Sequence, residues 1–217
     1  EIKNRFADKS GGNHRANQKS GIINSICRTI LYSWMGFSSD FTVEKPNKFI
    51  LALAPHTSNW DFIIGLLYSY AEDFHCNFLI KKEWFFWPMG IFMRSIGGIP
   101  VYRNKQMKTT DVIATQAKQL PHFRICITPE GTRSANPEWK KGFYYIAKGA
   151  GIPILLAGID LATKTITIGD KVYPLTDCDF PTVDPADPYA LTEEESHVID
   201  QLTDSFRHSE KLQKHVR

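Results

Sequence analysis

Apolar and polar positions alternate in blocks along the chain, and the blocks predict strands and helices in turn. The uninterrupted apolar run Phe49–Ala54 is typical of a strand buried on both faces. A second run, Phe62–Tyr70, has the length of a helix, and Asp61 stands at its start. Ser58 is a preferred helix-capping residue, and Asp61 follows it by three positions, which predicts a capping box. The block therefore predicts a strand, a short loop and a capped helix.

The same pattern continues to the C-terminal part of the chain. It predicts strands over residues 77–80, 97–103, 124–128, 152–159 and 164–169, and helices over 61–72, 109–120, 141–149 and from residue 192 onward. Because strands and helices alternate without a linker or an internal repeat, we expect one α/β domain, a single-domain mixed β-sheet flanked by helices.

The N-terminal part has a different character. Residues 1–20 are polar and without periodicity, which predicts a flexible basic lead-in. Residues 21–40 begin with apolar positions at helical spacing, which predicts an amphipathic helix. Two interpretations stay open: this helix packs against the domain, or it lies in a membrane interface with the lead-in attracted to anionic lipid. The domain itself is expected over residues 41–217.

Composition narrows the class of protein. Hydrophobic residues make up 42% and charged residues 23% of 217 residues, as in ordinary globular domains. Long uncharged stretches such as residues 29–39 and 84–93 are shorter than the ~20 residues of a spanning helix, so no membrane crossing is expected. The four cysteines are scattered, which favours reduced thiols in a cytoplasmic setting over a disulfide framework or a metal site.

The segment 81–94, KKEWFFWPMGIFMR, is unusually aromatic and has basic residues at both ends. It fits a buried core, an apolar slot for a long acyl chain, or a face that dips into a bilayer. Residues 81–108 carry six Lys or Arg and one acid, which indicates an anionic ligand. Nucleic acid is disfavoured because no recognisable binding motif is present.

Three polar blocks follow predicted strands, where α/β sheets build their ligand sites. They are His56 with Asp61, the block from Gly97 to Arg103, and the block from Pro129 to Ser134. Each has a simpler interpretation when taken alone: a helix cap, a surface arginine, and a turn with a salt bridge.

In this order and at these intervals, the blocks resemble the phospholipid/glycerol acyltransferase family, that of the 1-acylglycerol-3-phosphate acyltransferases. The family pattern H-x4-D matches His56 and Asp61, and the pattern G-x-I-x-V-x-R matches Gly97, Ile99, Val101 and Arg103. The third pattern, P-E-G-T-R-S, matches Pro129–Ser134 throughout. A fourth pattern, Ile-Pro before an apolar run, looks like Ile152–Pro153. The resemblance spans residues 49–158. Pro100 and Tyr102 depart from the family's usual residues at these positions. The departures concern the identity of the acceptor and leave the His–Asp pair intact.

The resemblance implies roles for these residues. His56 is expected as the base that removes the acceptor hydroxyl proton, since an imidazole pKa near ~6.5 suits that task. Asp61 would fix the ring tautomer and stabilise the imidazolium. Arg103 is the main candidate for the acceptor phosphate, because a guanidinium binds phosphate bidentately. The expected acceptor site is completed by Glu130, Gly131, Thr132 and Arg133, with Lys105 as a weaker cation.

The resemblance further implies the reaction and its partners. We expect an O-acyltransferase of phospholipid biosynthesis with a glycerol-3-phosphate acyltransferase-like fold, acting at the cytoplasmic face of a membrane. It would transfer a fatty acyl group from acyl-carrier protein or acyl-CoA to a lysophospholipid hydroxyl, most simply that of 1-acylglycerol 3-phosphate, without metal or further cofactor. Two alternatives stay open: another acceptor (a lyso-aminolipid, glycerol 3-phosphate or transacylation between phospholipids), or a non-catalytic lipid-binding module.

Overall fold

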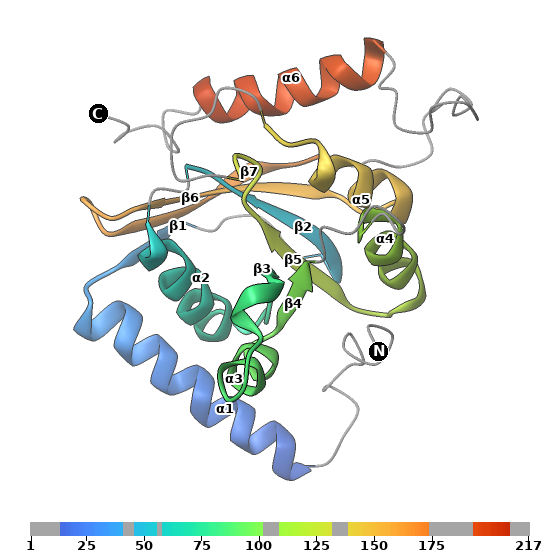
Figure 1. Ribbon diagram of the computed structural model, residues 1–217. Coiled ribbons are helices and arrows are strands. Elements are labelled where there is room, and N and C mark those ends of the chain that lie inside the picture. Colours follow the sequence, from blue (N-terminus) through green and yellow to red (C-terminus); the bar gives the residue numbers. More distant parts are fainter. Residues whose placement is uncertain are drawn as a thin grey trace.

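A seven-stranded sheet forms the centre of the molecule, with helices on both faces (Figure 1). The fold is seen in a computed structural model, which describes residues 14–40, 46–55, 58–101, 109–131, 139–173 and 193–208. The predicted single mixed α/β domain is confirmed.

The strand order is β1-β7-β6-β2-β5-β3-β4. The strands are β1 (Ser38–Asp40), β2 (Lys48–Leu53), β3 (Asn77–Lys81), β4 (Gly98–Val101), β5 (Phe123–Ile127), β6 (Ile154–Asp160) and β7 (Thr165–Tyr173). Five strands, β6, β2, β5, β3 and β4, run parallel, so their carboxyl ends meet at one edge of the sheet. β7 runs antiparallel to β6 and carries β1 in parallel at the outer edge.

The helices form two layers, one on each face of the sheet (Figure 1). They are α1 (His14–Arg28), the π-helical η2 (Thr29–Trp34), α2 (Asn59–Ala71), the short 3-10 turn η3 (Lys82–Trp84), α3 (Met89–Ser95), α4 (Thr109–Gln119), α5 (Gly142–Ala150) and α6 (Glu193–His208). α1 and α2 cover one face, and α4, α5 and α6 cover the other. α3 follows β3 and packs against β4.

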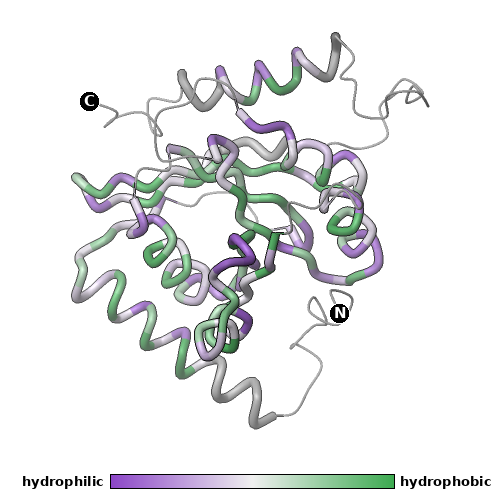
Figure 2. The backbone as a smooth tube through the Cα atoms, viewed as in Figure 1, coloured by the Kyte–Doolittle hydropathy of each residue, from purple (hydrophilic) through white to green (hydrophobic). Residues whose placement is uncertain are grey.

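β2 contributes to both cores, because successive side chains of a strand point to opposite faces. Ile50, Ala52 and Ala54 are buried beneath α4, α5 and α6. Phe49, Leu51 and Leu53 are buried on the side of α2 and η2. Two buried faces explain why this segment is an unbroken apolar run, and Figure 2 shows the hydrophobic residues concentrated along the central strands.

The N-terminal helix differs from the prediction at both ends. It begins at His14, before the expected start at Gly21, since residues 14–20 include Arg, Ala, Gln and Lys, which favour a helix without an apolar stripe. Helical structure ends at Trp34, and Gly36 then turns the chain with a left-handed backbone (φ 73°). Residues 38–40, predicted within the helical segment, instead form the strand β1. The rest of the predicted lead-in lies outside the described residues.

The aromatic segment 81–94 does not form a core. Five of its large side chains are exposed, namely Trp84, Phe86, Trp87, Ile91 and Phe92. Its backbone is nevertheless tightly packed, because a side chain at Gly90 would meet the Phe85 carbonyl oxygen at 2.6 Å. The core interpretation is therefore wrong for these five side chains.

Over the part of the chain that the structure describes, no helix combines the length and the apolar character needed to cross a bilayer.

Candidate active site

The first turn of α2 is built around Asp61, whose side chain is 1% exposed. The Ser58 N–H donates to Asp61 Oδ2 at 2.8 Å, and Ser58 Oγ accepts from the Trp60 N–H at 3.1 Å. The predicted capping box is thus confirmed. These bonds hold the Asp61 side chain at the N-terminus of the helix. Because a carboxylate accepts hydrogen bonds at both oxygens, capping through Oδ2 is compatible with orienting a second group.

A second polar turn follows β5. Glu130 is buried, with 8% of its surface exposed, and Gly131 has a left-handed backbone (φ 63°). The Gly131 N–H donates to the Thr128 carbonyl at 3.1 Å, which closes a tight turn. Glycine suits this position because other residues adopt that backbone with strain. The turn therefore holds an acidic side chain inside the protein at the carboxyl edge of the sheet.

Lys140 is a residue of this turn that the sequence analysis missed. Its backbone N–H donates to the Pro129 carbonyl at 2.7 Å. Its side chain lies across Gly131, since a Cβ at Gly131 would be 2.6 Å from Lys140 Nζ. The side chain is exposed, so its ammonium group is accessible to a ligand. The available signal was the basic pair that precedes Gly142, directly before α5.

The sheet brings these two turns to the same edge. β2 and β5 are adjacent and parallel, and Ala52 is in register with Ile127. The carboxyl ends of the two strands therefore lie side by side. β2 leads toward Ser58 and Asp61, and β5 leads toward Glu130. β4, which precedes Arg103 in the sequence, lies beyond β3 from β5. His56, Arg103, Lys105, Thr132 and Arg133 lie outside the described residues.

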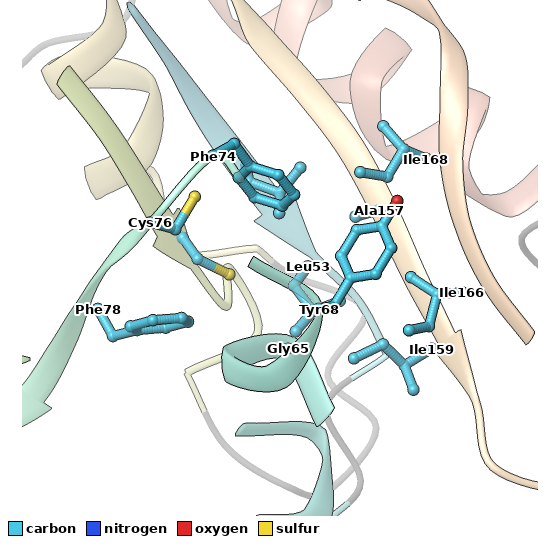
Figure 3. A pocket seen from close by; sticks show the side chains of 12 residues that line it. Leu53, Gly65, Tyr68, Phe74, Cys76, Phe78, Ala157, Ile159, Ile166 and Ile168 are labelled. Atoms are coloured by element: carbon cyan, nitrogen blue, oxygen red, sulfur yellow. The ribbon is translucent and has the colours of Figure 1, made fainter. Parts of the chain in front are cut away.

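A small apolar cavity lies between α2 and the sheet (Figure 3). Its lining comes from β2, α2, β3, β5, β6, β7 and the segment between α2 and β3, and includes Leu53, Tyr68, Phe74 and Ile168. A volume of about 20 Å³ is room for about one water molecule, which is far too small for an acyl chain. None of residues 84–93 lines it.

Two cysteines lie near this cavity, and neither is activated as a nucleophile. Cys76 and Cys126 are buried free thiols. Burial raises the pKa of Cys76 well above its usual value and that of Cys126 to about 12. Because the thiolate is the reactive form, both groups are inert near neutral pH. Cys27 is also a free thiol.

Comparison with known proteins identifies two similarities, and the first covers the sheet edge just described. The family described as Acyltransferase matches residues 40–159. A crystal structure of the 1-acyl-sn-glycerophosphate (LPA) acyltransferase PlsC from Thermotoga maritima is similar to this chain, with a TM-score of 0.55 and 15% sequence identity. The match covers 95% of this chain and 87% of that structure. At this identity the likeness concerns the fold.

The second similarity concerns the C-terminal part. The family described as Firmicute fructose-1,6-bisphosphatase matches residues 152–217. The class 3 fructose-1,6-bisphosphatase of Porphyromonas gingivalis is 51% identical over 59 residues, which is 27% of this chain and 9% of that protein. The Clostridium botulinum enzyme is 56% identical over 64 residues, 30% of this chain and 10% of that protein. The chain thus corresponds to about a tenth of the length of these curated relatives.

Proposed function

The chain belongs to the acyltransferase family, and we propose that it transfers a fatty acyl group from acyl-CoA or acyl-carrier protein to the hydroxyl of a lysophospholipid, most simply 1-acylglycerol 3-phosphate. The observation that carries the proposal is the buried Asp61 carboxylate, held by the capping box at the sheet edge beside the Glu130–Gly131 turn. A buried carboxylate beside a histidine is the arrangement that general-base catalysis uses.

In the proposed reaction His56 is the base. Two peptide steps separate it from Ser58, about 7.6 Å at most between Cα atoms, so a histidine at this position is within reach of Asp61. The acceptor hydroxyl attacks the thioester carbonyl carbon and passes its proton to His56. Asp61 accepts a hydrogen bond from the other ring nitrogen and stabilises the imidazolium. Collapse of the tetrahedral intermediate forms the ester and releases the thiolate, which takes the proton from His56.

Direct attack by the acceptor is the simplest mechanism. Buried Cys76 and Cys126 are unsuited to carry a covalent acyl intermediate, since burial keeps their thiols protonated. The acceptor phosphate would bind Arg103, with Arg133 and Lys105 nearby in the sequence blocks. We add Lys140 to these cations, because its side chain lies across the Gly131 turn.

The test is acyl transfer from radiolabelled palmitoyl-CoA to lysophosphatidate, comparing the intact chain with His56→Ala. We expect product from the intact chain alone. If the folded intact chain also gives no product, the assay is repeated with a lyso-aminolipid or glycerol 3-phosphate as the acceptor and with acyl-loaded acyl-carrier protein as the donor. An empty screen would overturn the proposal in favour of a non-catalytic lipid-binding module. Phosphate release from fructose 1,6-bisphosphate is measured in parallel, because of the C-terminal similarity.

A further inference from the structure

The segment between β3 and β4 presents an aromatic surface without a partner among the described residues. We define the aromatic ridge as Trp84, Phe86, Trp87, Ile91 and Phe92, whose exposed fractions run from 52% to 82%. Trp87, at 82%, is almost entirely in solvent. Exposure of five large apolar side chains within nine residues opposes the hydrophobic effect, and patches of this kind mark interaction surfaces.

The ridge is rigidly supported rather than loosely exposed. A Cβ at Gly90 would lie 2.6 Å from the Phe85 carbonyl oxygen, so the backbone before α3 is folded directly onto the helix. A Cβ at Gly98 would lie 2.6 Å from the Met93 carbonyl oxygen, so α3 is packed against β4 just as closely. Two glycine contacts of this kind fix α3 on the sheet and leave its apolar side chains projecting outward.

Charge around the ridge identifies the partner. Lys81 and Lys82 precede it and Arg94 follows it, all exposed, while Glu83 is the one acid within residues 81–94. Tryptophan and other aromatic rings favour the boundary between lipid head groups and acyl chains. Lysine and arginine beside them extend their charges toward anionic head groups. This combination fits a bilayer that contains anionic lipid better than a protein groove.

The ridge is also connected to the candidate active site. η3 directly follows the carboxyl end of β3, the edge at which β2 and β5 end, and α3 leads the chain from there to the start of β4. α2 begins at that edge, and its exposed Trp60 directly precedes Asp61. Phe62 of α2 packs against Phe78 of β3 with ring centroids 5.2 Å apart, which ties the two elements together.

We propose that the aromatic ridge inserts into the interfacial layer of an anionic membrane and so sets the candidate active site against the bilayer. The inference rests on the proposed function only in that a lysophospholipid acceptor would be drawn from the same membrane. Binding itself is independent of catalysis.

The test is co-sedimentation of the full chain with vesicles of phosphatidylcholine, alone or with about one third phosphatidylglycerol. The variant is Trp87→Ser combined with Phe92→Ser. The matched control is Leu161→Ser, because Leu161 directly follows β6, is 38% exposed and lies outside both the ridge and the helix predicted over residues 21–40. We expect the intact chain and the control to bind the anionic vesicles alike, and the ridge variant to bind at least about ten-fold less.

A charge variant, Lys81→Gln with Arg94→Gln, is expected to lose the preference for phosphatidylglycerol while keeping the residual binding to phosphatidylcholine. Equal binding of the ridge variant and the control would overturn the proposal. A concentration-dependent dimer that the ridge variant abolishes would also overturn it, in favour of contact with a second copy.

Acyl transfer separates this inference from the proposed function. In the first assay, short-chain donor and acceptor are dispersed below their critical micelle concentrations, and the ridge variant is expected to keep the wild-type rate of acyl transfer. In the second assay the acceptor is embedded in vesicles, and the ridge variant is expected to lose activity in proportion to its loss of vesicle binding. Vesicle binding by a chain without acyl transfer would refute the proposed function and leave the ridge proposal standing. Acyl transfer to the dispersed acceptor by a chain that does not bind vesicles would refute the ridge proposal and leave the proposed function standing.

Discussion

The two faces of the sheet are covered in different ways. Among the described residues, α4, α5 and α6 expose no large hydrophobic side chain, and their inner residues form one continuous core with β2. On the other side, α1, η2, α2 and the η3–α3 segment bury a second core. The same elements carry all the exposed large hydrophobic side chains of the described residues apart from Leu161. We call these the closed face and the open face. The difference is the one expected if the closed face serves folding alone and the open face also makes the proposed contact with a membrane.

The open face also carries the buried carboxylate, and substitution there is expected to have the largest effect. Asp61→Asn keeps an oxygen for the Ser58 N–H but disturbs the tautomer and charge balance of the proposed base. By analogy with hydrolase triads, we expect kcat for acyl transfer to fall on the order of 10³- to 10⁴-fold. Steady-state kinetics with vesicle-embedded lysophosphatidate measures the loss.

Ser58→Ala is the matched control for Asp61→Asn. It removes the Oγ cap of α2 while the backbone N–H that binds Asp61 remains. We expect it to cost about 1 kcal/mol of stability and to leave kcat near the wild-type value. A comparable fall in kcat for both variants would mean that Asp61 acts only through the helix cap.

A pair of phenylalanines measures the contrast between the faces directly. Phe143 of α5 is 1% exposed and packs against Trp139, whereas Phe92 of α3 is 55% exposed. Phe143→Ala is expected to cost about 3–5 kcal/mol of unfolding free energy. Phe92→Ala is expected to change it by less than about 0.5 kcal/mol. Urea unfolding at constant m-value measures both, and a large loss for Phe92→Ala would show that the ridge belongs to a core.

Lys140 directly precedes α5, so the closed face would contribute this residue to the proposed acceptor site. Lys140→Ala is expected to raise KM for a phosphate-bearing acceptor about ten-fold, since one charge-assisted hydrogen bond is lost, with little change in kcat. Lys141→Ala is the control, as Lys141 is an exposed neighbour of the same charge. Equal KM values for the two variants would remove Lys140 from the acceptor site.

The smallest expected effect concerns the buried core of the open face at alkaline pH. Burial, followed by the nearby Glu72 charge, raises the pKa of Tyr68 to about 12, although its hydroxyl is bonded to Ser39 Oγ at 2.8 Å. Because the folded protein disfavours the phenolate, this contribution to stability is complete below the unfolded pKa near 10 and is lost as pH rises toward 12. Tyr68→Phe should show a shallower loss of stability across that range in thermal unfolding. Identical slopes would assign the alkaline transition to other groups.

Much of this arrangement could be predicted from the sequence. The apolar run of β2 and the Ser58–Asp61 spacing are local signals, and both predictions are confirmed. For the ridge the sequence could not decide between a core, an acyl slot and a face toward a bilayer, because Pro88 and Gly90 break any periodicity. The supporting contacts of Gly90 and Gly98 are set by the tertiary fold. Lys140 was missed for a similar reason, since its approach to Gly131 depends on how the chain returns after the β5 turn. The roles of His56 and Arg103 stay predictions.

The pairing of β1 with β7 has a consequence for biosynthesis. Ser38 Oγ and Thr165 Oγ1 lie 3.4 Å apart but are separated by 127 residues. At a synthesis rate of roughly 5–20 residues per second, β1 waits about 6–25 s for its partner to be made. Until then β1 lacks the one strand that it pairs with among the described residues, so β7, the last strand of the sheet to be synthesised, completes the attachment of the first.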